Sequence, residues 1–179
     1  MPRIAQVDHE TATGKTKDLL DAVKAKLGFV PNLMSTLAVS PAALEAYLQF
    51  NTTLGGTLDA KTREIISLIV AETNGCGYCA SAHTALGKMV GLSEEEILTV
   101  RKGGATDPKH RAVIDLARRL TLNHGRLTEG EYAAAVQAGL TERQITEIIA
   151  NVALNIFTNT FNNVAKTTVD FPKIETVSV

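Results

Sequence analysis

The stretch REIISLIVAETNGCGYCASAHTALG, residues 63–87, contains both cysteines of this 179-residue chain and one of its four histidines. From Ile65 onward its first part is apolar around most of a helix's circumference, which predicts a buried helix. Asn74 and Gly75 are typical of a helix end. A second helix is expected over about residues 76–90. A buried helix followed at once by another helix indicates a helical fold.

The rest of the chain has the same helical character. Pro41 after Ser40 is typical of a helix start, and capping boxes begin at Ser93, Thr128 and Thr141. No segment alternates apolar and polar residues for a strand's length. The sequence therefore predicts an all-α fold, one domain over residues 1–179 with about seven or eight helices. The helical segments expected are 11–28, 40–50, 60–74, 76–90, 93–103, 109–124, 132–139 and 142–165, with a break at FVPN, residues 29–32.

Composition excludes several function classes. Hydrophobic residues make up 45% of the chain, charged residues 21%, and the net charge is −1, which is ordinary for a soluble globular protein. No Lys/Arg cluster marks a nucleic-acid interface. The longest apolar run, residues 65–71, is too short to cross a bilayer, and the N-terminal MPRIAQVDHE has no signal-peptide core. We therefore expect a cytoplasmic protein that binds neither nucleic acid nor membrane.

The two cysteines and the histidine are spaced for chemistry on one helix. Cys76, Cys79 and His83 share a face, and both thiols fall in the first helical turn, where anions are stabilised. His83 can take a proton from a thiol, and two thiols one turn apart can form a disulfide. Two other interpretations compete. Cysteines often simply pack, and a metal site would need further ligands because a closed zinc site has four.

Glu64 lies near the start of the buried helix that precedes the cysteines. A carboxylate there has two interpretations. It can be a partly buried proton carrier with a shifted pKa, or a surface glutamate that suits the positive end of the helix dipole. The local sequence favours the surface interpretation, because buried carboxylates are uncommon.

The stretch at 63–87 resembles the signature of the AhpD-like branch of the carboxymuconolactone decarboxylase superfamily. In that branch a glutamate stands twelve residues before a CxxC and a histidine four residues after it, which matches Glu64, Cys76, Cys79 and His83. Residues 28–47 and 138–165 resemble the flanking segments of its peroxidase-related members. The resemblance implies an all-helical antioxidant oligomer, a trimer or hexamer, with alkylhydroperoxidase activity. It also implies that Cys79 attacks peroxide, Cys76 resolves, and Glu64 and His83 relay protons.

One position departs from that family pattern. The branch has a second histidine directly before the last cysteine, where this chain has Tyr78. A phenol with an ordinary pKa near about 10 is a poor base at neutral pH, so Tyr78 either tunes a weaker relay or packs at a subunit interface. The superfamily's other branch, the lactone decarboxylases, uses no cysteine chemistry, and the residues around the CxxC offer no concentrated set of carboxylate-binding groups.

The function expected is that of a cysteine-dependent peroxidase. Its substrate would be a hydroperoxide and its electron donor a cellular dithiol or disulfide reductase. It would need neither cofactor nor metal, because both electrons come from the thiol pair. The alternatives are a non-enzymatic redox sensor or a metal-clipped oligomer, and a decarboxylase-type lyase. The asparagines of the last helix should bond across an interface or line the pocket, with the interface favoured: Asn155, Asn159, Asn162 and Asn163.

Overall fold

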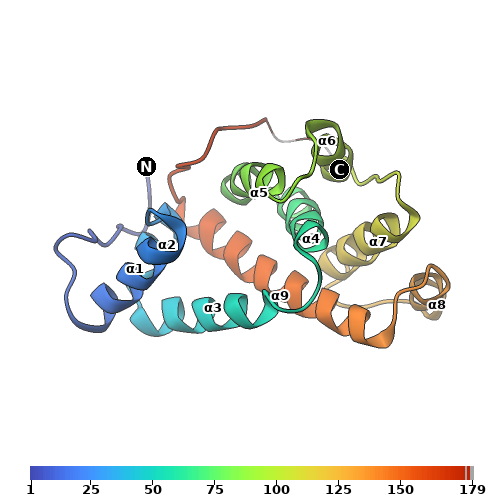
Figure 1. Cartoon of the computed structure of the whole chain (residues 1–179), viewed down its shortest axis with the longest axis horizontal. Helices are drawn as coiled ribbons and strands as arrows, with labels where there is room; N and C mark the ends of the chain where they lie inside the picture. Colours follow the sequence, from blue (N-terminus) through green and yellow to red (C-terminus); the bar gives the residue numbers. More distant parts are fainter. Residues whose placement is uncertain (176, 178–179) are drawn as a thin grey trace.

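A computed structural model describes residues 1–175 and 177. Within these residues the chain forms nine α-helices and no β-strand, which confirms the predicted all-α class (Figure 1). None of the described helices combines the length and hydropathy needed to cross a bilayer. The helices are α1 (Gly14–Leu27), α2 (Asn32–Leu37), α3 (Pro41–Leu54), α4 (Ala60–Thr73), α5 (Gly77–Met89), α6 (Glu94–Arg101), α7 (Pro108–Leu122), α8 (Glu129–Gln137) and α9 (Glu142–Ala165).

Helix α2 is the one helix that the sequence did not predict. It begins directly after Pro31, where a chain break was expected. The backbone N–H of Asn32 donates to the Asp170 carboxylate at 2.7 Å, and that of Leu33 donates to the Tyr78 hydroxyl at 3.1 Å. A six-residue helix has many unpaired N–H groups, so partners distant in sequence stabilise it.

Helix α4 lies at the centre of the molecule and contacts α5, α6, α7 and α9. Every residue from Ile65 to Glu72 is buried, as its apolar sequence predicted. Asp59 caps its start by accepting a hydrogen bond from the N–H of Thr62 at 3.0 Å. Helix α4 is therefore the central element of the core, and α5 packs against it.

Two apolar clusters pack around α4. The first joins α4 to α6, α7, α8 and α9, with Ile66, Ile114 and Ile148 completely buried. The second gathers α1, α2, α3 and α5 around Leu20 and Leu44. Both cysteines belong to the second cluster, so the thiols lie inside the apolar core rather than on the surface.

After α9 the chain turns back across the molecule. Lys166 ends the helix in the left-handed conformation, with φ of 54°. Residues 166–175, here called the C-terminal strap, then pass over α5 towards α6 (Figure 1). At the far end, the Arg101 side chain pairs with the buried Glu72 carboxylate and donates to the backbone carbonyl of Glu175. The strap thus covers the helix that carries the cysteines.

Candidate active site around the cysteine pair

The junction of α4 and α5 fixes the position of the cysteines. Gly75 adopts the left-handed conformation, with φ of 59°. Its N–H donates to Glu72 O at 3.0 Å, and the N–H of Cys76 donates to Ala71 O at 2.9 Å, which together form a Schellman motif. Cys76 is also the N-cap of α5, since its Sγ accepts from the N–H of Cys79 at 3.4 Å. One helix ends and the next begins within three residues.

Both cysteines are free thiols, and both are buried, with 1% and 2% of Cys76 and Cys79 exposed. A hydrogen bond from the Cys76 thiol lowers the pKa of Cys79. Burial opposes this, but the charge of His83 and the amide of Asn162 add to it, and the pKa falls to about 6. Sharing its proton with Cys79 raises the pKa of Cys76, and burial raises it further. The backbone N–H groups of Cys79 and Tyr78 lower the pKa of Cys76 but are outweighed, so the negative charge belongs on Cys79.

Glu64 and His83 form an ion pair across the α4–α5 hairpin. The distance from the Glu64 carboxylate to His83 Nδ1 is 2.8 Å, and the side chains are 16% and 21% exposed. Burial lowers the pKa of His83, but the Glu64 carboxylate outweighs it, so the net change is upward. The structure therefore places Glu64 in contact with the histidine rather than free on the surface. It brings together the four residues singled out from the sequence: Glu64, Cys76, Cys79 and His83.

Tyr78 lines the same pocket as His83, but its hydroxyl bonds to α2 rather than to the Glu64–His83 pair. Its hydroxyl accepts from the N–H of Leu33, and its ring packs edge-on against Phe171 of the C-terminal strap, with centroids 5.9 Å apart. Burial raises the pKa of the phenol above its ordinary value. Tyr78 is 6% exposed within the single chain, so it packs internally and positions α2 and the strap. Tyr78 therefore packs inside the chain rather than at a subunit interface, and a role in tuning the relay stays a prediction.

Two small pockets meet beside the cysteine pair. An apolar pocket of about 80 Å³ contacts Cys79 and is lined by Pro31, Leu33, Met34, Leu86 and Phe171 among others. A polar pocket of about 70 Å³ lies on the other side and contains Glu64, Arg63, Ser67, Asn151 and Asn155. Tyr47, His83 and Thr158 line both pockets. Cys79 therefore faces apolar space, while His83 also borders polar space.

The sequence did not single out Tyr47, Phe171 or the contact between Asn162 and Cys79. Asn162 is 4% exposed and its amide nitrogen donates to Cys79 Sγ at 3.2 Å. Of the two expectations for the asparagines of α9, pocket lining is found at Asn155, and the favoured interface role stays a prediction. Asn162 instead contacts a thiol, which neither expectation included. Amides within an apolar helix were the one available signal. Nothing local in the sequence connects residue 162 with residue 79.

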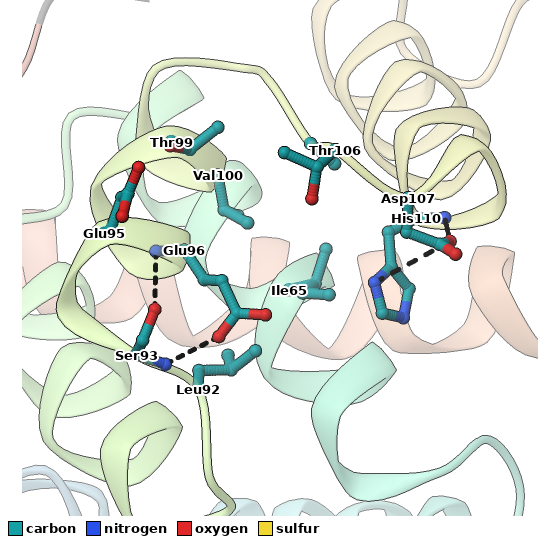
Figure 2. A pocket seen from close by; sticks show the side chains of 11 residues that line it. Ile65, Leu92, Ser93, Glu95, Glu96, Thr99, Val100, Thr106, Asp107 and His110 are labelled. Atoms are coloured by element: carbon teal, nitrogen blue, oxygen red, sulfur yellow. Dashed lines mark hydrogen bonds and ion pairs between the residues drawn. The ribbon is translucent and has the colours of Figure 1, made fainter.

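A larger pocket of about 310 Å³ lies away from the thiols, between α6 and the start of α7 (Figure 2). Three of its polar residues, Ser93, Glu96 and Asp107, serve helix capping. Glu96 accepts from the N–H of Ser93 at 2.7 Å, and Asp107 accepts from the N–H of His110 at 2.7 Å. Among the described residues, no group of three or more His, Cys, Asp and Glu side chains is arranged to hold a metal ion.

Residues 41–107 match the model of the carboxymuconolactone decarboxylase family. This segment contains α3 to α6, and with them the cysteine pair, the glutamate and the histidine described above. The matched segment is the one that carries the sequence motif, so the match supports the resemblance to the AhpD/carboxymuconolactone decarboxylase superfamily that the motif predicted.

Solved structures share the fold over nearly the whole chain. An uncharacterised peroxidase-related protein with an alkylhydroperoxidase AhpD core, from Ralstonia eutropha JMP134, superposes with a TM-score of 0.83 at 23% identity, covering 94% of this chain and 92% of that one. The debrominase Bmp8, as its C82A variant with 2,3,4-tribromopyrrole, gives 0.80 at 16% identity, covering 95% and 92%. The uncharacterised protein YdfG of Bacillus subtilis is 22% identical over 120 residues, 65% of this chain and 82% of that protein.

Proposed function

We propose that the protein is a thiol peroxidase that reduces organic hydroperoxides through Cys79 and Cys76. The observation that carries this proposal is the environment of Cys79. Its sulfur lies against an apolar pocket, has a pKa lowered to about 6, and is hydrogen-bonded to a second thiol. A thiolate is the reactive form of cysteine, and a neighbouring thiol is what completes a disulfide cycle.

The reaction proceeds in two balanced steps. The Cys79 thiolate attacks the terminal oxygen of the hydroperoxide, forming an S–O bond and breaking the O–O bond. The alkoxide that leaves takes a proton from His83, which Glu64 holds in its charged form. Cys76 then attacks the sulfenic acid, forming the disulfide and releasing water. The two electrons come from the thiol pair, so a dithiol or disulfide reductase must restore both thiols and no cofactor is required.

The lining of the apolar pocket supports a preference for organic hydroperoxides over hydrogen peroxide. Leu33, Met34 and Phe171 offer an alkyl or aryl group apolar surface next to the sulfur. Hydrogen peroxide gains nothing from such a surface. Cumene hydroperoxide should therefore oxidise the reduced protein faster than hydrogen peroxide does, and equal rates would remove this preference.

We also propose that the protein works as a homo-oligomer in the cytoplasm. Exposed apolar side chains on α3 and α9, among them Phe50, Ile149 and Phe157, offer surface for subunit contacts. Sedimentation velocity of the reduced protein tests this, and a monomer at micromolar concentration would contradict it.

The central experiment follows the oxidation of the fully reduced protein. The chain has no tryptophan, so rapid quenching with intact mass measurement replaces fluorescence. With cumene hydroperoxide the mass should fall by two hydrogens as the disulfide forms. Cys76→Ser should stop one oxygen heavier, at the sulfenic acid, and Cys79→Ser should not react. If the thiols of the folded protein survive excess peroxide, the proposal fails.

Turnover separates an enzyme from a sensor. With dithiothreitol present, an enzyme consumes many peroxide molecules per subunit, whereas a sensor oxidises only once. Because a debrominase that binds 2,3,4-tribromopyrrole shares the fold, this compound is included as a second test compound. If bromide is released and no peroxide is consumed, the thiol pair gives its two electrons to the bromopyrrole, and the peroxidase proposal fails.

A further inference from the structure

The asparagines of α9 use their side-chain amides in two ways. Asn151 and Asn155 each donate to the backbone carbonyl four residues earlier in the helix, at 2.8 and 2.9 Å. Asn163 is exposed and donates to the backbone carbonyl of Asn74 at 3.0 Å. These three amides stabilise the helix and its contact with the α4–α5 junction.

Asn159 and Asn162 face the cysteines instead. Asn162 donates to Cys79 Sγ at 3.2 Å. Asn159 is completely buried, and its side-chain oxygen accepts a hydrogen bond from the Asn74 amide at 3.0 Å. Its side-chain nitrogen, Nδ2, has no hydrogen-bond partner. The Asn159 amide is near enough to Cys79 for a weak hydrogen-bonding contribution that helps to lower the pKa of that thiol, but no acceptor lies within full hydrogen-bonding distance of Nδ2. Buried donors nearly always have an acceptor, so an unpaired N–H beside a reactive sulfur requires an explanation.

We infer that Asn159 and Asn162 form an amide cradle for the Cys79 sulfur. Asn162 holds the thiolate before the reaction, and the free N–H of Asn159 donates to the oxygen that the sulfur receives from peroxide. The inference rests on the proposed peroxidase function and adds two residues to its machinery.

The chemistry of the first step needs such donors. Negative charge begins on sulfur and spreads to the two peroxide oxygens as the O–O bond breaks. Donors fixed in a water-free site stabilise that charge without having to reorganise. The oxygen that stays on sulfur is then held until Cys76 attacks and displaces it as water. His83 supplies the proton to the other oxygen, so the two roles do not overlap.

The first test measures the thiolate without peroxide. In a Cys76→Ser background, the rate of iodoacetamide alkylation against pH gives the pKa of Cys79. Asn162→Leu is similar in size and lacks the donor. It should raise this pKa by about one unit, which slows alkylation at pH 6 by about five- to tenfold. Because alkylation requires no peroxidase activity, failure here is distinguishable from failure of the proposed function.

Asn163→Leu is the matched control, since it changes the same residue type one position further along the helix without contacting sulfur. It should leave the alkylation profile unchanged. Asn159→Leu should alter the later stage by shortening the lifetime of the sulfenic acid in the Cys76→Ser protein, measured by dimedone trapping. Asn74→Ala controls for the lost contact to the Asn159 oxygen. An unchanged pKa in folded Asn162→Leu, or equal shifts in Asn162→Leu and Asn163→Leu, would overturn the inference.

A second measurement needs no substitution on α9. In ¹⁵N-labelled Cys76→Ser protein, the side-chain amide resonances of Asn159 and Asn162 should shift with a midpoint at the pKa of Cys79. The Asn159 resonance should move again when peroxide adds an oxygen to the sulfur. If neither amide responds to ionisation or oxidation, the cradle does not exist, whatever the stability of the variants.

Discussion

Cys79 and His83 lie together in a part of the core where each supports the charged form of the other. The charge of His83 helps to lower the pKa of the thiol, and the thiolate helps to raise that of the imidazole. Glu64 adds to the second effect from α4. The consequence is a thiolate and an imidazolium held side by side, the pair that nucleophilic attack and leaving-group protonation require.

The Cys79 thiolate should make the reduced protein more stable at alkaline pH. Its pKa is about 6 in the folded protein against an ordinary value of 9.0. A lowered pKa stabilises the folded state fully above the unfolded value, and this stabilisation is lost as the pH falls through about 6. The gap in melting temperature between wild type and Cys79→Ser should therefore widen from pH 6 to pH 9. If the melting temperatures of the two proteins change in parallel with pH under reducing conditions, this prediction is wrong.

Replacing Glu64 with Gln should slow peroxide oxidation at pH 7 by about tenfold, since a positioned acid contributes roughly a hundredfold or more in full. The Glu64–His83 pair also contributes stability. A raised histidine pKa gives stabilisation that is complete below the ordinary value of 6.5 and lost as the pH rises through the raised value. The variant should thus lose more stability at pH 6 than at pH 9 in urea unfolding. Glu95→Gln, at an exposed position of α6, is the control, and an equal loss of stability there would refute the pairing.

The junction between α4 and α5 shows how one backbone position places a whole helix. Gly75→Ala should destabilise the protein by about 1 kcal/mol, because a Cβ is strained at its positive φ although no side chain lies within 4 Å. Gly77→Ala, two residues later in helical geometry and equally open, should stabilise the protein by about 0.5 kcal/mol. Urea unfolding of the reduced proteins measures both. If both substitutions change the free energy of unfolding in the same direction, the backbone conformation at Gly75 does not explain its effect.

At the scale of helices, local sequence predicted most of the structure. The capping boxes at Ser93, Thr128 and Thr141 all form, and each starts a helix. Helix α2 escaped prediction because its first N–H groups bond to Asp170 and Tyr78, which only the tertiary fold brings near. Local signals specify where a helix begins when its cap is local, and fail when the partner is distant.

The residues of the candidate site also fall into two groups, those on adjacent helices and those from distant segments of the chain. Local sequence favoured a surface position for Glu64, and only the family resemblance grouped it with His83. In the structure the two residues lie on consecutive helices joined by a short turn, which brings them into contact. Asn162 was not predictable, since its contact with Cys79 depends on how α9 crosses α5. Phe171 was not, since it belongs to a strap without regular structure. Residues that join the site from elsewhere in the chain need the packed molecule to reveal them.

Across the whole molecule, the buried pair of Glu72 and Arg101 connects the central helix to α6 and the strap. The two side chains are only 1% and 7% exposed. Arg101→Met should destabilise the protein by about 3–5 kcal/mol, because it leaves the Glu72 carboxylate buried without its partner. The double variant Glu72→Met/Arg101→Met should recover most of that loss in urea unfolding. A double variant as unstable as the single one would locate the effect in the strap contacts instead.

The path of the strap also bears on how the thiols are protected during synthesis. Thr168 and Asp170 bind Asn32, and Phe171 covers the pocket beside Cys79. These three strap residues emerge from the ribosome long after both cysteines. A growing chain therefore presents an incomplete thiol site to the cell until α9 and the strap have been made. Oxidants and thiol reagents should reach Cys79 more easily in nascent chains than in the finished protein, so the chain is most open to damage while it is being translated.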